Sequence, residues 1–365
     1  MIERVRTPGD IRRFVRFQID LYRFDPHFVP PILSVFTKEM DREILKARRA
    51  VGLLWTAEGR VEGRLFYAFA HDEKHGREVC WFSNFECVDD QAVADALFGE
   101  MEADMRTRGV LHAEGTYAPH DPDTRRGILV DGFDDDPAFL TSYNKPYYAR
   151  LLENAGYAKT VDTVAVAAEG TAANYRTLSA IAERFDRKHD VRIDALSWRN
   201  LERDLDDVHA ILARATTEMN YQRAPSLDMI RSVAESLRLF LDPKLVLIAR
   251  REDSGEAVGF VFVMPDFNEV LKRTRGRIRP LAFLILRNRI RRVRGTLQYV
   301  VPEMQNTGLV FRMYFAVFER MRERGMTRLE GGTIVLGNFK SYATFLKLGG
   351  RIAKTFRLYG KDLTP

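Results

Sequence analysis

Disulfide bonds, a signal peptide and membrane spans have little support in this sequence of 365 residues. It contains only two cysteines, Cys80 and Cys87, which are too few for a disulfide framework and favour a reducing cytoplasm. The N-terminus, MIERVRTPGDIRRF, is too charged to be a signal peptide. No apolar run approaches the roughly 20 residues that a membrane-spanning helix needs. We therefore expect a cytoplasmic globular protein, and its length suggests two domains.

Acidic residues are missing from one segment, between Leu271 and Arg294, although the whole chain has 51 of them. The segment carries ten basic residues: Lys272, Arg273, Arg275, Arg277, Arg279, Arg287, Arg289, Arg291, Arg292 and Arg294. Since the net charge of the chain is only +6, the remainder is slightly acidic. The protein is thus a mildly acidic body with one basic segment.

Within this basic segment, Pro280 is suited to begin a helix, and LAFLILRNRIRRV then places apolar residues beside arginines. A basic amphipathic helix tends to lie at a membrane interface, so we expect it to bind an anionic membrane surface. The residues expected at the membrane are Arg277, Arg279, Leu281, Phe283, Leu284, Arg287 and Arg291. A solvated helix that covers the domain is the alternative. Few aromatic residues interleave with the arginines, so nucleic acid is not an expected partner.

The two halves of the chain resemble each other. MRTRGVLHAEG (105–115) matches MRERGMTRLEG (321–331) at six positions, 216 residues apart. Each copy is preceded by a hairpin signal, at 53–70 and 245–264, and followed by a helix that stops at glycine. We therefore predict two α/β domains, residues 1–170 and 171–365, each with a mixed, mostly antiparallel sheet flanked by helices. The second domain carries the basic segment as an insertion at 265–294.

The segment from Thr296 to Gly350 has the order of elements expected of a site for a phosphorylated carrier. An apolar strand (295–301) leads through QNTGLV into a long helix, and a strand (328–335) and a second helix follow. Backbone amides at a loop that becomes a helix N-terminus are unsatisfied and form a cradle for anions. Coenzyme A suits such a cradle. In the N-terminal half, Asp89 and Asp90 stand at the corresponding place and would repel a pyrophosphate, so we expect no nucleotide there.

These features resemble motif A of the GNAT acyltransferase superfamily, whose loop has the pattern Gln/Arg-x-x-Gly-x-Gly/Ala. Gln305 and Gly308 match this pattern, and Val310 replaces the final small residue. FECVDD (85–90), GILVDGFD (127–134), YNKPYYARLLENAGY (143–157) and VPEMQNTGLV (301–310) together are similar to a bacterial family of tandem GNAT-like proteins that includes ceramide synthases. The resemblance implies transfer of a long-chain acyl group from acyl-CoA to the amine of a membrane lipid, in the first place a sphingoid base.

The resemblance also implies site residues in the C-terminal half. The residues expected at acyl-CoA are Val300, Val301, Gln305, Asn306, Thr307, Gly308, Leu309, Val310, Asn338 and Phe345. In GNAT enzymes a tyrosine about seven residues after the motif asparagine often protonates the departing thiolate, and Phe345 stands there. Tyr342, one helical turn earlier, is our candidate for the phenol. The strand 295–301 lacks the carboxylate that often acts as base, which makes Glu330 a candidate, beside Glu303 and Glu114.

Two segments of the N-terminal half are candidates for the acceptor site. His120, in a loop after the repeated Glu-Gly strand, is a candidate base because the unperturbed pKa of histidine is near 6.5; a solvated turn is the alternative. Tyr117, Tyr143, Asn144, Tyr147 and Tyr148 are expected to line a substrate groove, with core packing as the alternative. HDEKH (71–75) spaces two histidines as zinc helices do, but it follows a strand and precedes Gly76, so we expect a turn and no metal.

The sequence thus predicts an N-acyltransferase that uses acyl-CoA and lies on the inner face of the cytoplasmic membrane. One alternative is an acetyltransferase for a soluble amine or a protein. The other is a non-catalytic GNAT relic that binds acyl-CoA or lipid, which Val310 and Phe345 favour.

Overall fold

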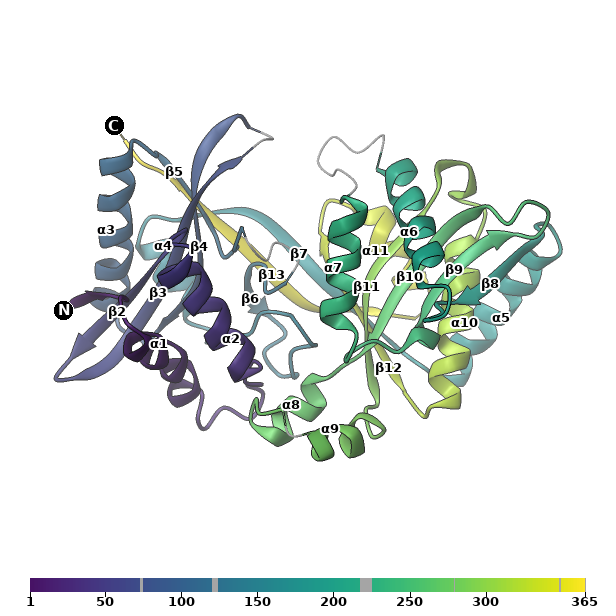
Figure 1. Cartoon of the computed structure of the whole chain (residues 1–365), viewed down its shortest axis with the longest axis horizontal. Helices are drawn as coiled ribbons and strands as arrows, with labels where there is room; N and C mark the ends of the chain where they lie inside the picture. Colours follow the sequence, from purple (N-terminus) through teal and green to yellow (C-terminus); the bar gives the residue numbers. More distant parts are fainter. Residues whose placement is uncertain (73–74, 120–123, 217–224, 279, 348, 365) are drawn as a thin grey trace. The chain divides into compact units, whose positions relative to one another are not determined.

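The computed structural model describes residues 1–72, 75–119, 124–216, 225–278, 280–347 and 349–364, and its contacts divide the chain into two compact units (Figure 1). Unit 1 comprises Met1–Val164, Val270–Leu284 and Lys354–Pro365, and unit 2 comprises Ala165–Glu269 and Ile285–Ala353. Two strands, β7 (Ala158–Glu169) and β13 (Arg351–Asp362), each begin in one unit and end in the other. Unit 1 therefore takes segments from both ends of the sequence.

Unit 1 is built on a mixed sheet. Its strand order is β1-β2-β3-β4-β5-β13; the β4–β5 pair is parallel, and the other neighbouring pairs in this order are antiparallel. The elements before β7 are β1 (Ile2–Arg4), α1 (Pro8–Leu21), α2 (Leu33–Met40), η1 (Asp41–Lys46), β2 (Ala50–Ala57), β3 (Arg60–Asp72), β4 (Arg77–Cys87), α3 (Gln91–Arg108), β5 (His112–Gly115), β6 (Ile128–Asp131) and α4 (Tyr148–Asn154).

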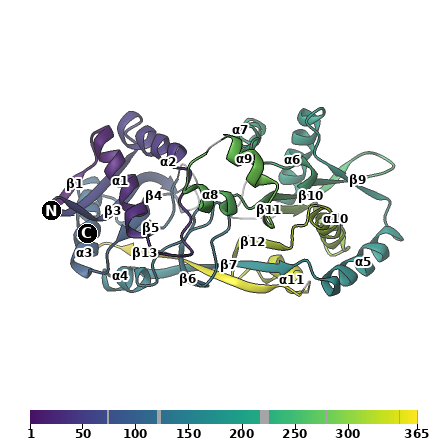
Figure 2. The ribbon, with the colours of Figure 1, turned by 90° about the horizontal axis from the view of Figure 1, so that it is seen from below.

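The sheet of unit 1 carries a hydrophobic core on each face, because apolar residues follow one another along its strands while successive side chains point to opposite faces. Leu53 and Leu65 pack in the core that α3 and α4 cover. Their chain neighbours Leu54 and Phe66 pack in the core beneath α1 and α2. Figure 2 shows the same arrangement, with α1 and α2 on one side of these strands and α3 and α4 on the other.

Unit 2 is also a mixed sheet between helices. Its strand order is β7-β12-β11-β10-β9-β8, with β11 and β12 parallel. α5 and α10 pack together on one face, and α6 and α7 lie on the other (Figure 2). Its other elements are α5 (Ala172–Asp186), β8 (Val191–Ala195), α6 (Leu201–Ala215), α7 (Leu227–Leu237), η2 (Pro243–Leu245), β9 (Val246–Arg251), β10 (Ala257–Pro265), β11 (Arg292–Val300), η3 (Pro302–Met304), α10 (Leu309–Glu323), β12 (Arg328–Val335) and α11 (Phe339–Lys347). The helices α8 (Asn268–Thr274) and α9 (Pro280–Arg287) contribute residues to both units.

Most of the elements that the sequence predicted are confirmed. Both hairpins are present, as β2–β3 and β9–β10, and α10, β12 and α11 follow β11 in the expected order. The predicted start of β11 at residue 295 was three residues late. Arg292 and Arg294 lie inside the strand: Arg292 faces the carboxylates of Asp266 and Glu330, and Arg294 is only 3% exposed. These two arginines therefore do not belong to an exposed basic surface.

Candidate functional site

The central feature of unit 2 is a pair of parallel strands that part midway. The paired register of β11 and β12 runs from Arg292 opposite Arg328 to Gly295 opposite Gly331. Beyond these glycines β11 continues to Val300 and β12 to Val335 without further pairing between them. On its other side, β11 remains paired with β10. The edge of β11 that faces β12 is thus open from Thr296 onward.

A bulge in β11 lies where the strands part. Val263 pairs with Gly295 and Phe262 with Leu297, so Thr296 has no partner on β10. A one-residue bulge reverses the face to which the following side chains point. The hydroxyl Oγ1 of Thr296 is buried and makes no hydrogen bond within the described part of the chain. This backbone irregularity sits at the mouth of the gap between β11 and β12.

Unit 1 repeats this arrangement, as the sequence repeat predicts. Its parallel pair β4–β5 ends at Phe82 opposite Gly115, and β4 then bulges at Asn84, which has a φ of 50°. Glu114 in this pair corresponds to Glu330, 216 residues later. Each unit therefore has a parallel strand pair whose first strand bulges just after the pairing ends.

The loop after β11 leads into α10 as expected of an anion cradle. Gly308 is the N-cap residue of α10 with a φ of 102°, a conformation that favours glycine. No hydrogen bond from the backbone amides of Gly308, Val310 and Phe311 is recorded within the described residues. Unpaired amides and the positive end of a helix dipole are the features that attract a phosphate group at a helix N-terminus.

The rest of the predicted acyl-CoA loop is held in place by its own contacts. The hydroxyl of Thr307 donates to the carbonyl of Met304 at 2.7 Å and accepts from the amide of Leu309 at 3.3 Å. The amide of Gln305 donates to Pro302, and Asn306 has a φ of 61°. Val301 is buried, whereas Val300, at the end of β11, is half-buried. The loop is therefore fixed in a shape that leaves the start of α10 open.

Phe345 lies against the gap between the strands. A Cβ built on Gly331 would come within 2.7 Å of its ring atom Cζ, so the ring fills the space of the missing side chain. Tyr314, from α10, meets the Phe345 ring edge to face with centroids 5.1 Å apart. Its hydroxyl donates to Oε1 of Gln298 at 2.7 Å, and burial raises the pKa of this phenol. Sequence reasoning missed Tyr314 and Gln298, because the bulge that brings them together cannot be recognised from residue alternation.

Tyr342 and Asn338 lie at the start of α11. The hydroxyl of Tyr342 donates to the carbonyl of Leu336 at 3.2 Å, and the side chain is 8% exposed. The amide of Asn338 donates to the carbonyl of Val335 at 2.8 Å and closes the turn after β12. Tyr342 thus lies one helical turn before Phe345 on α11, and its hydroxyl is hydrogen-bonded to the turn between β12 and α11.

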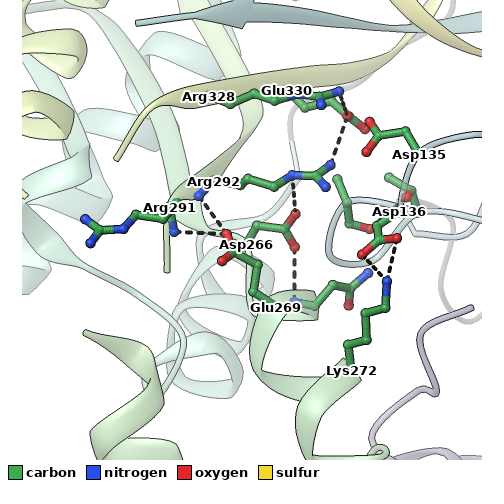
Figure 3. Close-up of polar contacts among 12 residues, drawn as sticks. Asp135, Asp136, Asp266, Glu269, Lys272, Arg291, Arg292, Arg328 and Glu330 are labelled. Atoms are coloured by element: carbon green, nitrogen blue, oxygen red, sulfur yellow. Dashed lines mark hydrogen bonds and ion pairs between the residues drawn. The ribbon is translucent and has the colours of Figure 1, made fainter. Parts of the chain in front are cut away.

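Glu330 is held by arginines on the opposite face of the sheet (Figure 3). Its Oε2 lies 3.5 Å from Nη2 of Arg292 and 3.3 Å from Nη2 of Arg328. Because neighbouring residues on a strand point to opposite faces, Glu330 points away from Phe345, which contacts the face of Gly331. To act as a base, this carboxylate would have to give up ion pairs with two guanidinium groups.

The start of β11 is joined by a second set of contacts to two acidic residues that precede the basic segment (Figure 3). Oε1 of Glu269 accepts hydrogen bonds from the amides of Arg291 and Arg292 at 2.9 and 2.8 Å. Nε of Arg292 lies 3.5 Å from Oδ2 of Asp266, which is buried. These contacts fix the point where the chain enters β11.

The tyrosines predicted for a substrate groove make contacts within unit 1. The hydroxyl of Tyr143 donates to Asp25 at 2.9 Å, and that of Tyr147 to the carbonyl of Cys87 at 2.7 Å. Asn144 is buried and exchanges hydrogen bonds with the backbone of Leu129. Tyr117 packs on Trp81 with centroids 4.6 Å apart. These contacts agree with the core-packing interpretation, which the sequence left open beside a substrate role. His120 lies outside the described residues.

Tyr148 belongs to a buried polar network around Glu86 on β4. Oε2 of Glu86 accepts from the hydroxyls of Tyr148 at 2.7 Å and Tyr22 at 2.8 Å, and Oε1 accepts from Gln18 at 2.6 Å. Arg64, which has no exposed surface, lies 3.5 Å from the same carboxylate. Burial raises the pKa of Glu86. In unit 1 the strand past the bulge is thus covered by the protein's own side chains.

The basic segment exposes part of the predicted membrane helix. α9 presents Leu281 and Ile285, 78% and 60% exposed, one helical turn apart. The flanking Arg277, Arg287 and Arg291 are also exposed, while Phe283 is half-buried. Arg279 lies outside the described residues, and Leu284 belongs to the helix. Within the described residues no helix has the length and apolar character to cross a membrane, and no group of three or more metal-binding side chains occurs.

Comparisons with known proteins place this geometry in context. No family model matches the chain. It is 26% identical over 379 residues to the bacterial ceramide synthase of Caulobacter vibrioides, with 98% of this chain and 96% of that protein covered. It is 23% identical over 370 residues to protein YghO of Escherichia coli, with 97% and 93% covered.

Solved structures share the fold at low sequence identity. A tandem GNAT protein from the clavulanic acid biosynthesis pathway superimposes with a TM-score of 0.59 at 12% identity, covering 100% of this chain and 99% of that one. A GCN5-related N-acetyltransferase from Sphaerobacter thermophilus gives a TM-score of 0.54 at 13% identity, covering 100% and 96%. The predicted pair of GNAT-like α/β domains is therefore confirmed. The chain therefore has the fold of tandem GNAT proteins, and it is similar over nearly its whole length to a bacterial ceramide synthase.

Proposed function

We propose that the chain transfers a long-chain acyl group from acyl-CoA to the amine of a membrane lipid. The C-terminal half, residues 171–365, is proposed to bind acyl-CoA. One observation carries this proposal: β11 and β12 part at Gly295 and Gly331, and the loop after β11 opens α10 with unpaired amides at Gly308, Val310 and Phe311. An open strand edge that ends in an anion cradle fits a pantetheine chain that ends in a pyrophosphate.

The residues around the gap support an acyl chain as the other end of this ligand. Leu297 on β11 and Val335 and Leu336 at the end of β12 are 39%, 44% and 40% exposed, although they are large apolar side chains. All three side chains lie beyond Gly295 and Gly331, where β11 and β12 cease to pair. Covering each methylene of an acyl chain contributes about 0.8 kcal/mol, so such a surface favours a long chain over acetate.

A lipid amine is the proposed acceptor, and a sphingoid base is our first candidate. The ceramide synthase named above is a full-length relative, and α9 exposes apolar residues between arginines. We propose that α9 attaches the enzyme to the inner face of the cytoplasmic membrane, where a long-chain amine resides. A soluble acceptor would give no reason for exposed Leu281 and Ile285.

The reaction needs few groups from the protein. The amine nitrogen attacks the thioester carbonyl carbon, the C–S bond breaks, and the proton lost by nitrogen ends on the thiolate. Tyr342 remains our candidate for the proton donor and His120 our candidate for the base, because Glu330, the other predicted base, points to the opposite face of the sheet and is paired with Arg292 and Arg328. Proton transfer contributes about 10²–10⁴-fold, and placement of the reactants contributes more.

The test is mass spectrometry of products formed from palmitoyl-CoA and sphinganine in detergent micelles. We expect ceramide from the wild-type protein and its loss in Gly308→Glu, which puts a carboxylate into the anion cradle. Gly59→Glu is the matched control: it lies in the turn between β2 and β3 of unit 1, has a positive φ of 77° as Gly308 has one of 102°, and a new side chain there meets nothing within 4 Å. Product formed only from acetyl-CoA and a soluble amine would favour the first alternative. Saturable CoA binding without product from any amine would favour the relic.

A further inference from the structure

The bulge in β11 determines which face Gln298 occupies. In a regular strand, Gly295 and Gln298 would point to opposite faces, because they are three residues apart. Thr296 is the extra residue of the bulge, so Gln298 stands two ladder positions from Gly295 and points to the same face. That face is the one covered by α10 and by Phe345.

Tyr314 holds one end of the Gln298 side chain. Its hydroxyl donates to Oε1 at 2.7 Å, and it lies 3.8 Å from the position of a Cβ on Gly295. Tyr314 is itself 2% exposed and fixed by its ring contact with Phe345. An amide whose oxygen is occupied in this way keeps its two N–H donors for another acceptor. No acceptor for Nε2 of Gln298 is recorded among the described residues, and the side chain is half-buried.

We propose that the side-chain amide of Gln298 donates a hydrogen bond to the thioester carbonyl of acyl-CoA, and that Tyr314 positions it. This inference rests on the proposed function, because it needs a thioester in the gap between β11 and β12. Negative charge develops on the carbonyl oxygen when the amine attacks, and a preorganised N–H donor stabilises it. The charge disappears when the carbonyl re-forms and the C–S bond breaks. Gln298 is then a catalytic residue, and Tyr314 is a positioning residue.

A purely structural role for this pair predicts different behaviour. If the hydrogen bond only stabilised unit 2, its loss would lower the stability and would affect all ligands alike. If Gln298 contacts the carbonyl, its loss affects only ligands that have one. Binding of palmitoyl-CoA is therefore compared with binding of its thioether analogue, S-hexadecyl-CoA, which has CH₂ in place of the carbonyl.

The variants are Gln298→Leu, which keeps the size of the side chain, and Tyr314→Phe, which keeps the ring on Phe345. Tyr175→Phe is the matched control, because the hydroxyl of Tyr175 donates to Glu319 on the same helix α10 at 3.0 Å. We expect the wild type to bind the thioester about two- to tenfold more tightly than the thioether, as one hydrogen bond provides. This preference should vanish in Gln298→Leu and shrink in Tyr314→Phe. In ceramide formation, kcat of Gln298→Leu should fall about 10²-fold or more, whereas KM for palmitoyl-CoA should rise by no more than the two- to tenfold lost in binding.

Each result decides one question. An unchanged preference for the thioester in Gln298→Leu overturns this inference and leaves the proposed function standing. A wild-type protein that binds neither ligand overturns the proposed function and the inference with it. Binding with the expected preference but no ceramide supports the inference and points to another acceptor.

Discussion

Phe345 shows why a residue can depart from a family pattern. The GNAT resemblance implies a tyrosine at this position, but ring atom Cζ of Phe345 points at Gly331, 2.7 Å from where a Cβ would stand. A hydroxyl on Cζ would collide with the backbone of β12. Glycine at 331 and phenylalanine at 345 are therefore a matched pair, and the phenol of the site has to come from another residue.

This pairing predicts the effect of a single methyl group. In Gly331→Ala the new Cβ overlaps the Phe345 ring, so the free energy of unfolding should fall by about 1–3 kcal/mol, as overpacking costs. Adding Phe345→Leu should restore part of the loss, because the smaller side chain leaves room. Urea denaturation measures both. Gly337→Ala is the control, since a Cβ there meets nothing within 4 Å; equal losses at 331 and 337 would contradict this account.

At the scale of elements, α9 carries the membrane proposal. Leu281→Glu introduces a charge on a side chain that is 78% exposed, so folding should be unaffected. We expect weaker binding to vesicles that contain anionic lipid, in a sedimentation assay, and weaker binding of the wild type as salt rises. Phe24→Glu is the matched control, because Phe24 is 90% exposed outside this segment. An equal loss from both variants would mean that α9 is not the contact.

Strands β7 and β13 are linked in unit 1 by an ion pair that should respond to acid. Nε and Nη2 of Arg357 donate to the two oxygens of Asp162 at 2.8 and 3.2 Å, and this hydrogen bonding holds the pKa of Asp162 below its usual value. An aspartate whose pKa is lowered by folding stabilises the protein fully at pH values above its ordinary pKa, about 3.9. This stabilisation is lost as the pH falls through the lower pKa of the folded state.

We therefore expect Asp162→Asn to lower the free energy of unfolding by about 1–3 kcal/mol at pH 7 and by much less near pH 2. Chemical denaturation across this pH range measures the difference between the two proteins. Asp20→Asn is the control, since Asp20 forms an exposed pair with Arg16. A constant difference at all pH values would show that charge is not the cause.

For the whole molecule, the sequence predicted the repeated architecture well and the details of the site poorly. Alternating apolar residues identified both hairpins, and the repeat identified two halves of the same α/β type. The bulge at Thr296 was beyond such reasoning, because alternation assumes a regular strand. The burial of Arg292 and Arg294 was missed because Asp266 and Glu330, which approach Arg292, come from other parts of the chain. The local sequence pattern predicts helices and strands. The site, in contrast, depends on a strand bulge and on contacts between residues far apart in the sequence.

The same dependence on distant partners makes unit 1 sensitive to changes far along the chain. Phe356, Leu358 and Tyr359 of β13 are buried, and Tyr359 pairs with Gly115 of β5. Removing residues 354–365 should abolish hydrogen-exchange protection of the amides in β2, β3 and β4, while β9 and β10 keep theirs. Removing only residues 364 and 365 is the control. Protected β2–β4 amides in the longer truncation would contradict this expectation.

The path of β13 also sets an order of events during synthesis. The ribosome makes residues 1–164 first, then residues 165–353, which contain all of unit 2, and only afterwards the part of β13 that completes the core of unit 1. Unit 1 is therefore the first unit to be translated and the last whose core can be completed. Until then its β5 edge is an unpaired strand edge, which is a site for aggregation. Slow translation of residues 165–353 prolongs that exposure, so chaperone demand should depend on the codons of unit 2.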